Sequence, residues 1–153
     1  MRITTKGRYA LRAMANLARD NSQKPKAIKN IAAEENISPE FLEQIFFKLK
    51  KSGVISSVRG PGGGFVITKP LTEINVADIF LAVDEGLDLS PCTAACNDVP
   101  EFDCDQTDNC LAYVVWKDAT LHITEYFRNL TLEAIVSKNR HRAALLAMSG
   151  DLV

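Results

Sequence analysis

Residues 37–67, ISPEFLEQIFFKLKKSGVISSVRGPGGGFVI, decide how this chain folds. Ser38 is a favourable helix N-cap, and Pro39 suits the first helical position because its missing N–H would have no helical partner there. Gly53 is expected to end this helix. Apolar and polar residues fall on opposite faces of it. The inner face carries Phe41, Leu42, Ile45, Phe46 and Leu49, and the outer face carries Glu40, Glu43, Gln44, Phe47, Lys48 and Lys51.

A β-hairpin is expected directly after this helix. Residues 54–59 and 65–68 are rich in β-branched side chains, and the stretch GPGGG at 60–64 joins them. Two further helices are expected before it, over residues 5–19 and 27–35, and a short turn at 35–37 leads into Ser38. A helix-turn-helix followed by a basic hairpin is the layout of a winged helix-turn-helix that reads DNA. The fold class expected is therefore mostly α with a small β-hairpin.

The net charge of −1 hides two halves of opposite sign. Residues 1–70 hold 13 Lys and Arg against 5 Asp and Glu, whereas residues 71–153 hold 5 against 14. This asymmetry indicates that the first half meets a polyanion, although two solvated faces of unlike sign would give the same counts. No apolar run approaches the roughly 18–20 residues that cross a bilayer, and the N-terminus is too basic throughout for a signal peptide. We expect a cytoplasmic protein without membrane contact.

Candidate DNA contacts come from three places in the first half. Cations crowd the start of the first helix, where they oppose the helix dipole unless a phosphate lies nearby. Gln44 could pair with adenine, Glu40 or Glu43 could accept from cytosine, and Lys48 would take a phosphate. Arg59 could enter the minor groove, with glycines allowing close backbone approach. The candidates are Arg2, Thr5, Lys6, Ser38, Glu40, Phe41, Glu43, Gln44, Lys48, Arg59, Gly60, Gly62 and Gly63. An ordinary solvated helix face is the alternative interpretation.

The second half is expected to continue as helix, loop, helix. Asn75 would cap a helix within residues 71–85, and periodicity then disappears from 86 to 109. A helix of about 30 Å should run from Cys110 to near Asn129. Its apolar surface exceeds what the small domain can cover, which favours pairing in a two-fold homodimer. Thr131 would cap a short last helix. The expected organisation is a DNA-binding domain at 1–85, a cysteine-rich cluster-binding loop at 86–110, the dimerisation and following helices at 111–137, and a tail at 138–153.

All four cysteines lie in one short stretch, at Cys92, Cys96, Cys104 and Cys110. In a cytosolic chain this concentration favours metal or redox chemistry over a structural disulfide. Structural zinc sites use paired C-x2-C knuckles, which are missing here, whereas thiolates on a loop suit an iron–sulfur cluster, [2Fe-2S] or [4Fe-4S]. A zinc site, a thiol switch or an electron-transfer protein remain alternatives. No catalytic constellation is found, so we do not expect an enzyme.

The chain resembles the IscR/NsrR-type family of winged-helix iron–sulfur transcription regulators, and is closest to its IscR branch. The motifs that carry the resemblance are MRITTKGRYALRAM, SPEFLEQIFFKLKKSG, SVRGPGGGF and the CLAYVVWKD run from Cys110. The resemblance covers residues 1–136. It implies a bacterial homodimer that binds promoter DNA as a repressor and senses cluster status, iron, nitric oxide or redox stress. It also implies contact with cluster-delivery proteins.

The resemblance also implies which thiols bind the cluster. Cys104 and Cys110 match two of the family's ligands, and the third is Cys96 or Cys92. The fourth ligand varies in the family. One branch has a histidine at the position of Tyr113, and another has an acidic residue in the first helix, where this chain has Arg8. The extra cysteine would therefore complete an all-Cys site. Some members of the family bind DNA without any cluster.

Overall fold

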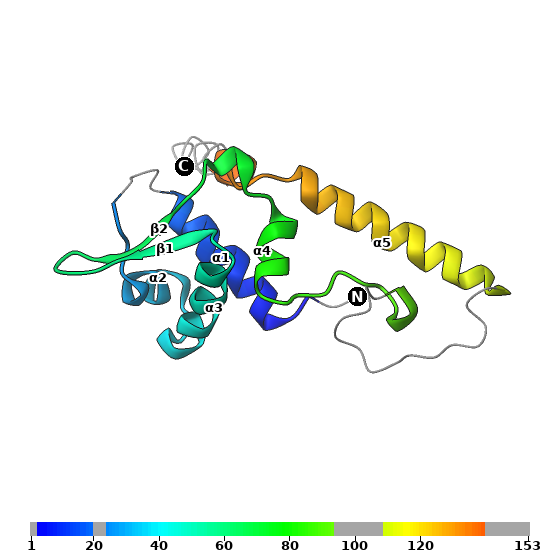
Figure 1. Ribbon diagram of the computed structural model, residues 1–153, viewed down its shortest axis with the longest axis horizontal. Helices are drawn as coiled ribbons and strands as arrows, with labels where there is room; N and C mark the ends of the chain where they lie inside the picture. Colours follow the sequence, from blue (N-terminus) through cyan, green and yellow to red (C-terminus); the bar gives the residue numbers. More distant parts are fainter. Residues whose placement is uncertain (1–2, 20–23, 94–108, 140–153) are drawn as a thin grey trace, which may run out of the picture.

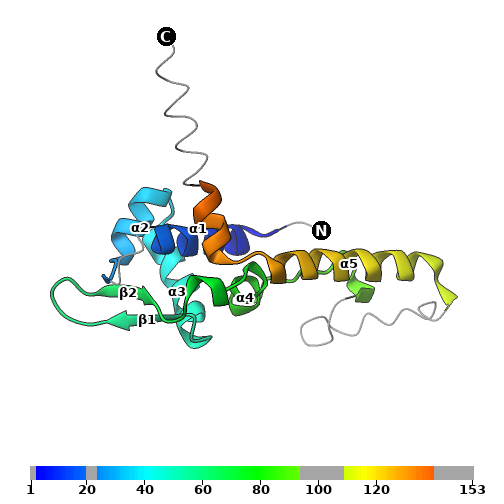
Figure 2. The ribbon, with the colours of Figure 1, turned by 90° about the horizontal axis from the view of Figure 1, so that it is seen from above.

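The computed structural model describes residues 3–19, 24–93 and 109–139. Its helices are α1 (Thr5–Arg19), α2 (Ile28–Glu35), α3 (Pro39–Lys51), α4 (Val76–Ala82) and α5 (Leu111–Asn129), and its strands are β1 (Ile55–Val58) and β2 (Gly64–Ile67). Short 3-10 turns occur at η1 (Leu71–Glu73) and η2 (Pro91–Thr93), and residues 132–139 are also helical. The first four helices and the hairpin form one body, from which α5 projects (Figures 1 and 2).

The expected apolar faces form the core of this body. The buried face of α1 includes Ala10, Ala13, Met14 and Leu17, and that of α3 consists of Leu42, Ile45, Phe46 and Leu49. Burial of each large side chain stabilises the fold by about 1.5–3 kcal/mol relative to exposure. The outer face of α3 is left for solvent or a partner.

Local hydrogen bonds set the helix ends as the sequence predicts. The Ser38 hydroxyl accepts from the Phe41 N–H at 3.2 Å, and Asn36 turns the chain between α2 and α3 with φ of 52°. Asn75 and Asp78 form a reciprocal capping box at the start of α4. Gly53, with φ of +77°, follows the end of α3.

The helix expected within residues 71–85 is shorter than its apolar pattern suggests. It begins at Val76, directly after the predicted Asn75 cap, and Ile74 before the cap is extended, with a carbonyl that accepts from the Leu132 N–H at 2.8 Å. It ends at Ala82, and Asp84 beyond it has a left-handed φ of 54°. The predicted start after Asn75 is therefore confirmed, and the residue before the cap pairs with a distant segment.

The hairpin is held to the body by a third extended segment. β1 and β2 are antiparallel, with Ile55 opposite Ile67 and Val58 opposite Gly64. On the other side of β2, Lys26 and Phe65 exchange backbone hydrogen bonds of 3.0 and 2.9 Å. A Cβ at Gly64 would lie 2.3 Å from the Lys26 carbonyl oxygen, so this close approach requires glycine. The hairpin is thus positioned against the body rather than hanging from it.

The end of the described chain returns to the first domain. Leu132 and Val136 are buried in the same core as α1 and α3, and the Phe127 ring packs edge-on against Phe80 with centroids 5.3 Å apart. The helix at 132–139 therefore completes the core formed by the first helices, a role the sequence did not indicate. The rest of the expected tail lies outside the described residues. No helix in the described ranges has the length and hydropathy needed to cross a bilayer.

Candidate nucleic-acid interface and cysteine site

The outer face of α3 presents a group of exposed side chains. Glu40, Glu43, Gln44, Phe47 and Lys48 border one shallow hollow, and Phe47 is 70% exposed. Helical spacing places the amide and carboxylate groups of this set on one side of the helix, where they can reach base edges. These are residues expected on the outer face of this helix, and their contact with DNA stays a prediction.

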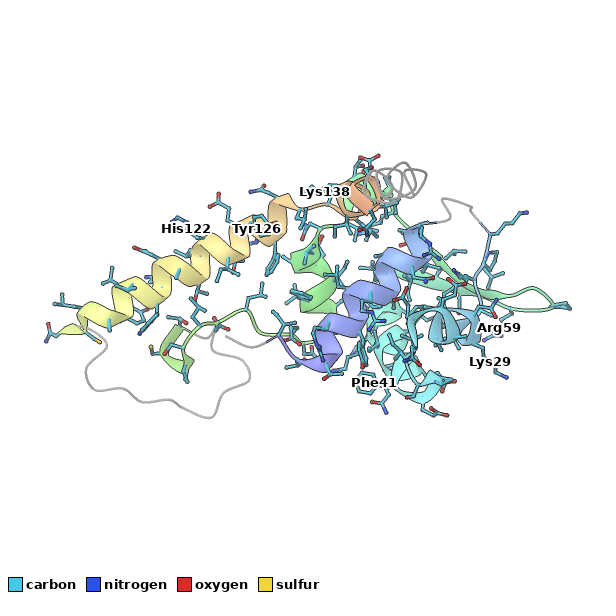
Figure 3. The ribbon with its side chains drawn as sticks, turned by 180° about the vertical axis from the view of Figure 1, so that it is seen from behind. Lys29, Phe41, Arg59, His122, Tyr126 and Lys138 are labelled. Atoms are coloured by element: carbon cyan, nitrogen blue, oxygen red, sulfur yellow. The ribbon has the colours of Figure 1, made fainter. Side chains whose placement is uncertain are left out.

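Two other candidates on α3 have positions that serve the helix itself. The Ser38 side chain is engaged as the N-cap. Phe41 is half-buried, with its ring edge-on to that of Tyr9 at 5.7 Å between centroids (Figure 3). The structure thus gives Phe41 a packing contact between α1 and α3, and it orients the recognition helix from within.

The start of α1 is bound by a carboxylate from the end of α4. Glu85 is only 7% exposed, and its oxygens accept from the Thr4 N–H at 2.8 Å and from the Gly7 N–H at 3.1 Å. The Thr4 hydroxyl also donates to Glu85. These bonds satisfy N–H groups that a helix start leaves without helical partners. Thr5 is exposed as the first residue of α1, and Arg2 lies outside the described residues.

Two lysines expected to contact phosphate converge on Asp84. The Lys6 ammonium donates to the Asp84 carbonyl oxygen at 3.2 Å, and the Lys48 ammonium forms an ion pair with the Asp84 carboxylate. The hydrogen bond from Lys48 lowers the pKa of the Asp84 carboxyl, with added effects of the Lys48, Lys6 and Lys51 charges. A cationic cluster with one carboxylate within it therefore lies beside the recognition face.

The hairpin tip is exposed, and two of its glycines have a left-handed backbone conformation. Arg59 directly follows β1 and points away from the body (Figure 3). Gly60 and Gly62 have φ of +101° and +74°, which favour glycine, and a Cβ at Gly63 would lie 2.4 Å from the Val58 carbonyl oxygen. The glycines are thus needed for the turn itself, and the tip presents bare backbone next to one guanidinium.

Cys92 and Cys110 are placed by different contacts. Cys92 lies in η2, where its Sγ is 3.1 Å from the Ser90 hydroxyl, and Cys110 is the N-cap residue of α5. The segment before Cys92 is attached to α5, because the Leu89 N–H donates to the Thr120 hydroxyl at 3.3 Å. Both thiols are free and half-buried. Cys96 and Cys104 lie outside the described residues, and among the described ones no three Cys, His, Asp or Glu side chains gather into a metal site.

The charged residues near Cys92 and those on α1 have different surroundings. Burial raises the pKa of the Asp88 carboxyl, which lies shortly before Cys92. On α1, Arg12 forms an ion pair of 3.1 Å with Glu35, and the Arg8 guanidinium donates to the Thr5 hydroxyl at 3.3 Å. Arg12 is therefore engaged with α2.

A long apolar surface is exposed on α5. None of its residues is buried in this chain. Its exposed large side chains are Leu111, Val114, Val115, Trp116, Leu121 and Tyr126. His122 and Tyr126, which are both exposed, lie one helical turn apart on α5 (Figure 3). This much apolar surface on one helix is typical of an interaction site.

Comparison with known proteins gives the family. The sequence profile of the Rrf2 family, described as an iron-dependent transcriptional regulator, matches residues 3–138. The chain belongs to the Rrf2 family. This confirms the resemblance inferred from the motifs, and the protein is a DNA-binding transcriptional regulator.

Named relatives agree with this Rrf2 assignment. The HTH-type transcriptional regulator IscR of Photorhabdus laumondii is 39% identical over 137 residues, which cover 90% of this chain and 80% of the relative. IscR of Vibrio cholerae is 37% identical over 139 residues, covering 91% and 77%.

Two solved structures of regulators have the same fold. T. potens IscR matches with a TM-score of 0.71 and 27% identity, covering 91% of this chain and 88% of that one. CymR, described as the global cysteine regulator of B. subtilis, matches with a TM-score of 0.69 and 28% identity, covering 90% and 98%. The winged helix-turn-helix expected from the sequence is confirmed.

Sequence reasoning missed three residues whose contacts position the candidate site. Asp84 and Glu85 were counted only as the end of a helix, and Thr120 only as part of the long helix. Their partners lie 31 to 81 residues away in the sequence. The one available signal was the acidic pair just before Gly86, within the stretch 70–116 that has no Lys or Arg.

Proposed function

We propose that this Rrf2-family regulator binds promoter DNA as a homodimer, and that iron–sulfur cluster occupancy at its cysteines controls the binding. The observation that carries the proposal is the position of the cysteine segment. It begins just after Asp84 and Glu85, which contact the two helices that carry candidate DNA contacts, and it ends at Cys110, the N-cap residue of α5. A conformational change in this segment would therefore occur next to both the proposed DNA-binding face and the helix proposed for dimerisation.

The residues present fit an iron–sulfur cluster. Four thiols are soft donors of the kind that iron–sulfur clusters take, and the two described ones are free and partly accessible. Cys92, Cys96, Cys104 and Cys110 would hold it, and four thiolates suit either a [2Fe-2S] or a [4Fe-4S] cluster. When bound, such a cluster supplies a group sensitive to oxygen, nitric oxide and iron supply. The chain's own part is to anchor Cys92 through the contact between Leu89 and Thr120.

The proposed DNA complex places α3 in the major groove. Gln44 would read adenine, and Glu40 or Glu43 would accept from cytosine N4. Arg59 would enter the minor groove beside the glycine tip. Lys6 and Lys48 would contact phosphates, as would Arg2 and the backbone at Gly60, Gly62 and Gly63.

The proposed dimer pairs α5 with α5 of a second copy. The exposed apolar side chains of α5 give such a pairing its surface, and a two-fold dimer would match palindromic half-sites about one helical turn apart. We also propose a cytoplasmic location and delivery of the cluster by partner proteins.

A thiol switch or a zinc site is the second candidate. The free Cys92 thiol beside the Ser90 hydroxyl favours a switch, because a partly exposed thiol can be oxidised. Membership in a family of transcriptional regulators disfavours an electron-transfer role.

Anaerobic purification followed by metal analysis distinguishes these candidates. The proposal predicts coloured protein that contains iron and acid-labile sulfide, both lost when the four cysteines are replaced by alanine. Colourless protein with zinc would support the zinc alternative. Protein without metal that forms a reversible disulfide would support the thiol switch.

A further inference from the structure

Asp84 occupies a position between α4 and the recognition helix. α4 packs against both α1 and α3 (Figure 1). From its end, the Asp84 carboxylate forms an ion pair with Lys48 of α3, and the Asp84 carbonyl accepts from Lys6 of α1 at 3.2 Å. One residue thus contacts two cations that the proposed function assigns to DNA phosphates.

Lys48 lines two hollows of the surface. One is the shallow hollow of the recognition face, with Glu43, Gln44 and Phe47. The other lies between α3 and α4 and is lined in part by Glu73, Leu81 and Asp84. The Lys48 ammonium can therefore turn toward the recognition face or toward Asp84, but its charge is directed to one of them at a time.

The ion pair can be broken at low cost. The Lys48 and Asp84 side chains are 38% and 60% exposed, and exposed pairs contribute little to stability. A DNA phosphate at the recognition face offers Lys48 a competing anion of the same kind. When Lys48 binds a phosphate, it must give up its ion pair with Asp84, so one anionic partner replaces another. A lysine without an ion pair would gain the phosphate contact without this loss.

We propose that Asp84 is an intramolecular competitor of DNA phosphate for Lys48, and that it lowers the affinity of the recognition helix for DNA. The proposal rests on the proposed DNA-binding function. Asp84 acts through Lys48 and needs no contact with DNA of its own. Its place directly before the cysteine segment puts this competition next to the proposed sensor.

The Asp84→Asn variant tests the proposal. Asn adopts the left-handed φ of 54° found at residue 84 with little strain, so the backbone and the carbonyl bond to Lys6 are retained. Affinity is measured by fluorescence anisotropy, with a labelled duplex of about 30 base pairs selected from a random pool by the wild-type protein. We expect D84N to bind about two- to fivefold more tightly, with a salt dependence steeper by about one charge.

A matched control removes the general effect of charge. Glu73 is an exposed carboxylate of the same hollow, and it forms no ion pair within the described part of the chain. Glu73→Gln changes the net charge as D84N does, and should leave affinity within about twofold of wild type.

A double-mutant cycle separates competition from repulsion. Lys48→Gln should weaken binding, and adding D84N to it should give no further change, because Asp84 then has no Lys48 to hold. If D84N alone fails to tighten binding, the inference is wrong. It is also wrong if the gain persists in the K48Q background, which would indicate simple repulsion of DNA. Failure of the wild-type protein to bind any duplex would instead reject the proposed function.

Discussion

Glu85 shows what a single buried carboxylate does for the DNA-binding face. It accepts hydrogen bonds from Thr4 and Gly7 at the N-terminus of α1, where a negative charge also interacts favourably with the helix dipole. Gly7 makes room for it, because a Cβ there would lie 2.6 Å from the Glu85 Oε2 atom. The start of α1, which carries Lys6, is therefore fixed relative to α4.

Replacing Glu85 by alanine should lower the free energy of unfolding by about 1–3 kcal/mol, because buried N–H groups lose a charged acceptor. Urea unfolding followed by circular dichroism measures this. Glu73→Ala is the control, since that carboxylate is exposed, and it should change stability by less than about 0.5 kcal/mol. Equal effects of the two substitutions would show that the Glu85 contacts contribute nothing.

Glu34 gives the fold a dependence on pH. Its carboxylate accepts from Lys26 at 2.8 Å and from Asn16 at 2.9 Å, and the hydrogen bond from Lys26, followed by that from Asn16, lowers its pKa. A pKa lowered by folding stabilises the protein above the unfolded value of about 4.3, and this stabilisation is lost as the pH falls through the folded value.

Glu34→Gln should therefore lower the melting temperature at pH 7, and the difference from wild type should shrink as the pH falls below about 4.3. The effect is expected to be small, because the Glu34 side chain is 40% exposed. Thermal unfolding from pH 7 to pH 3 measures it. A difference that stays constant over this range would mean that the charge of Glu34 is not what stabilises the fold.

At the residue scale, the sequence predicts local contacts and misses distant ones. Ser38 and Asn75 were expected as caps, and both are confirmed because a cap's partner lies three residues away. Asp84 and Glu85 were missed because Lys48 lies 36 residues away and Gly7 lies 78 away. Which carboxylate meets which lysine depends on the packing of α4, and no spacing rule gives that.

At the scale of secondary-structure elements, α3 and the hairpin were predicted from the sequence. α3 was predicted with its cap, its inner face and its end, since its periodicity is strong and its boundaries are marked by Pro39 and Gly53. The hairpin strands were likewise predicted. The start of α4 after Asn75 was also predicted, but the pairing between Ile74 and Leu132 cannot be read from an apolar pattern.

Arg59→Ala and Gln44→Ala should affect DNA binding in different ways. Loss of Arg59 should weaken binding to all duplexes and reduce the salt dependence by about one charge. Loss of Gln44 should relax the preference at one base position by about 1–3 kcal/mol and leave the salt dependence unchanged. Titrations at several salt concentrations, with cognate and single-substituted duplexes, measure both. The wing assignment is wrong if R59A keeps wild-type affinity and salt dependence.

At the scale of the whole molecule, α5 and the helix at 132–139 have opposite surroundings. Leu132 and Val136 are buried in the core, whereas every residue of α5 remains at least partly accessible. The sequence indicated the excess apolar surface of α5, but it could not show which of the two helices would return to the body. Within the described residues, α5 is therefore the element with a surface to offer a second copy.

Val114→Glu combined with Leu121→Glu should make the protein monomeric and weaken its binding to a palindromic duplex. Both side chains are more than half exposed, so the substitutions should leave the fold intact while placing charges in the proposed dimer interface. Analytical ultracentrifugation measures the mass, and circular dichroism checks the helix content. A wild-type protein that is already monomeric, or a variant that remains dimeric, would contradict the α5 pairing.

The central claim is that the cysteine segment controls how the basic first half binds DNA. The most direct measurement compares the affinity of anaerobically prepared protein, with its metal bound, and of the same preparation after removal of the metal, for one selected duplex. The account predicts that the two affinities differ, and that alanine at the four cysteines abolishes the difference while DNA binding is retained. Equal affinities for the two preparations would contradict it.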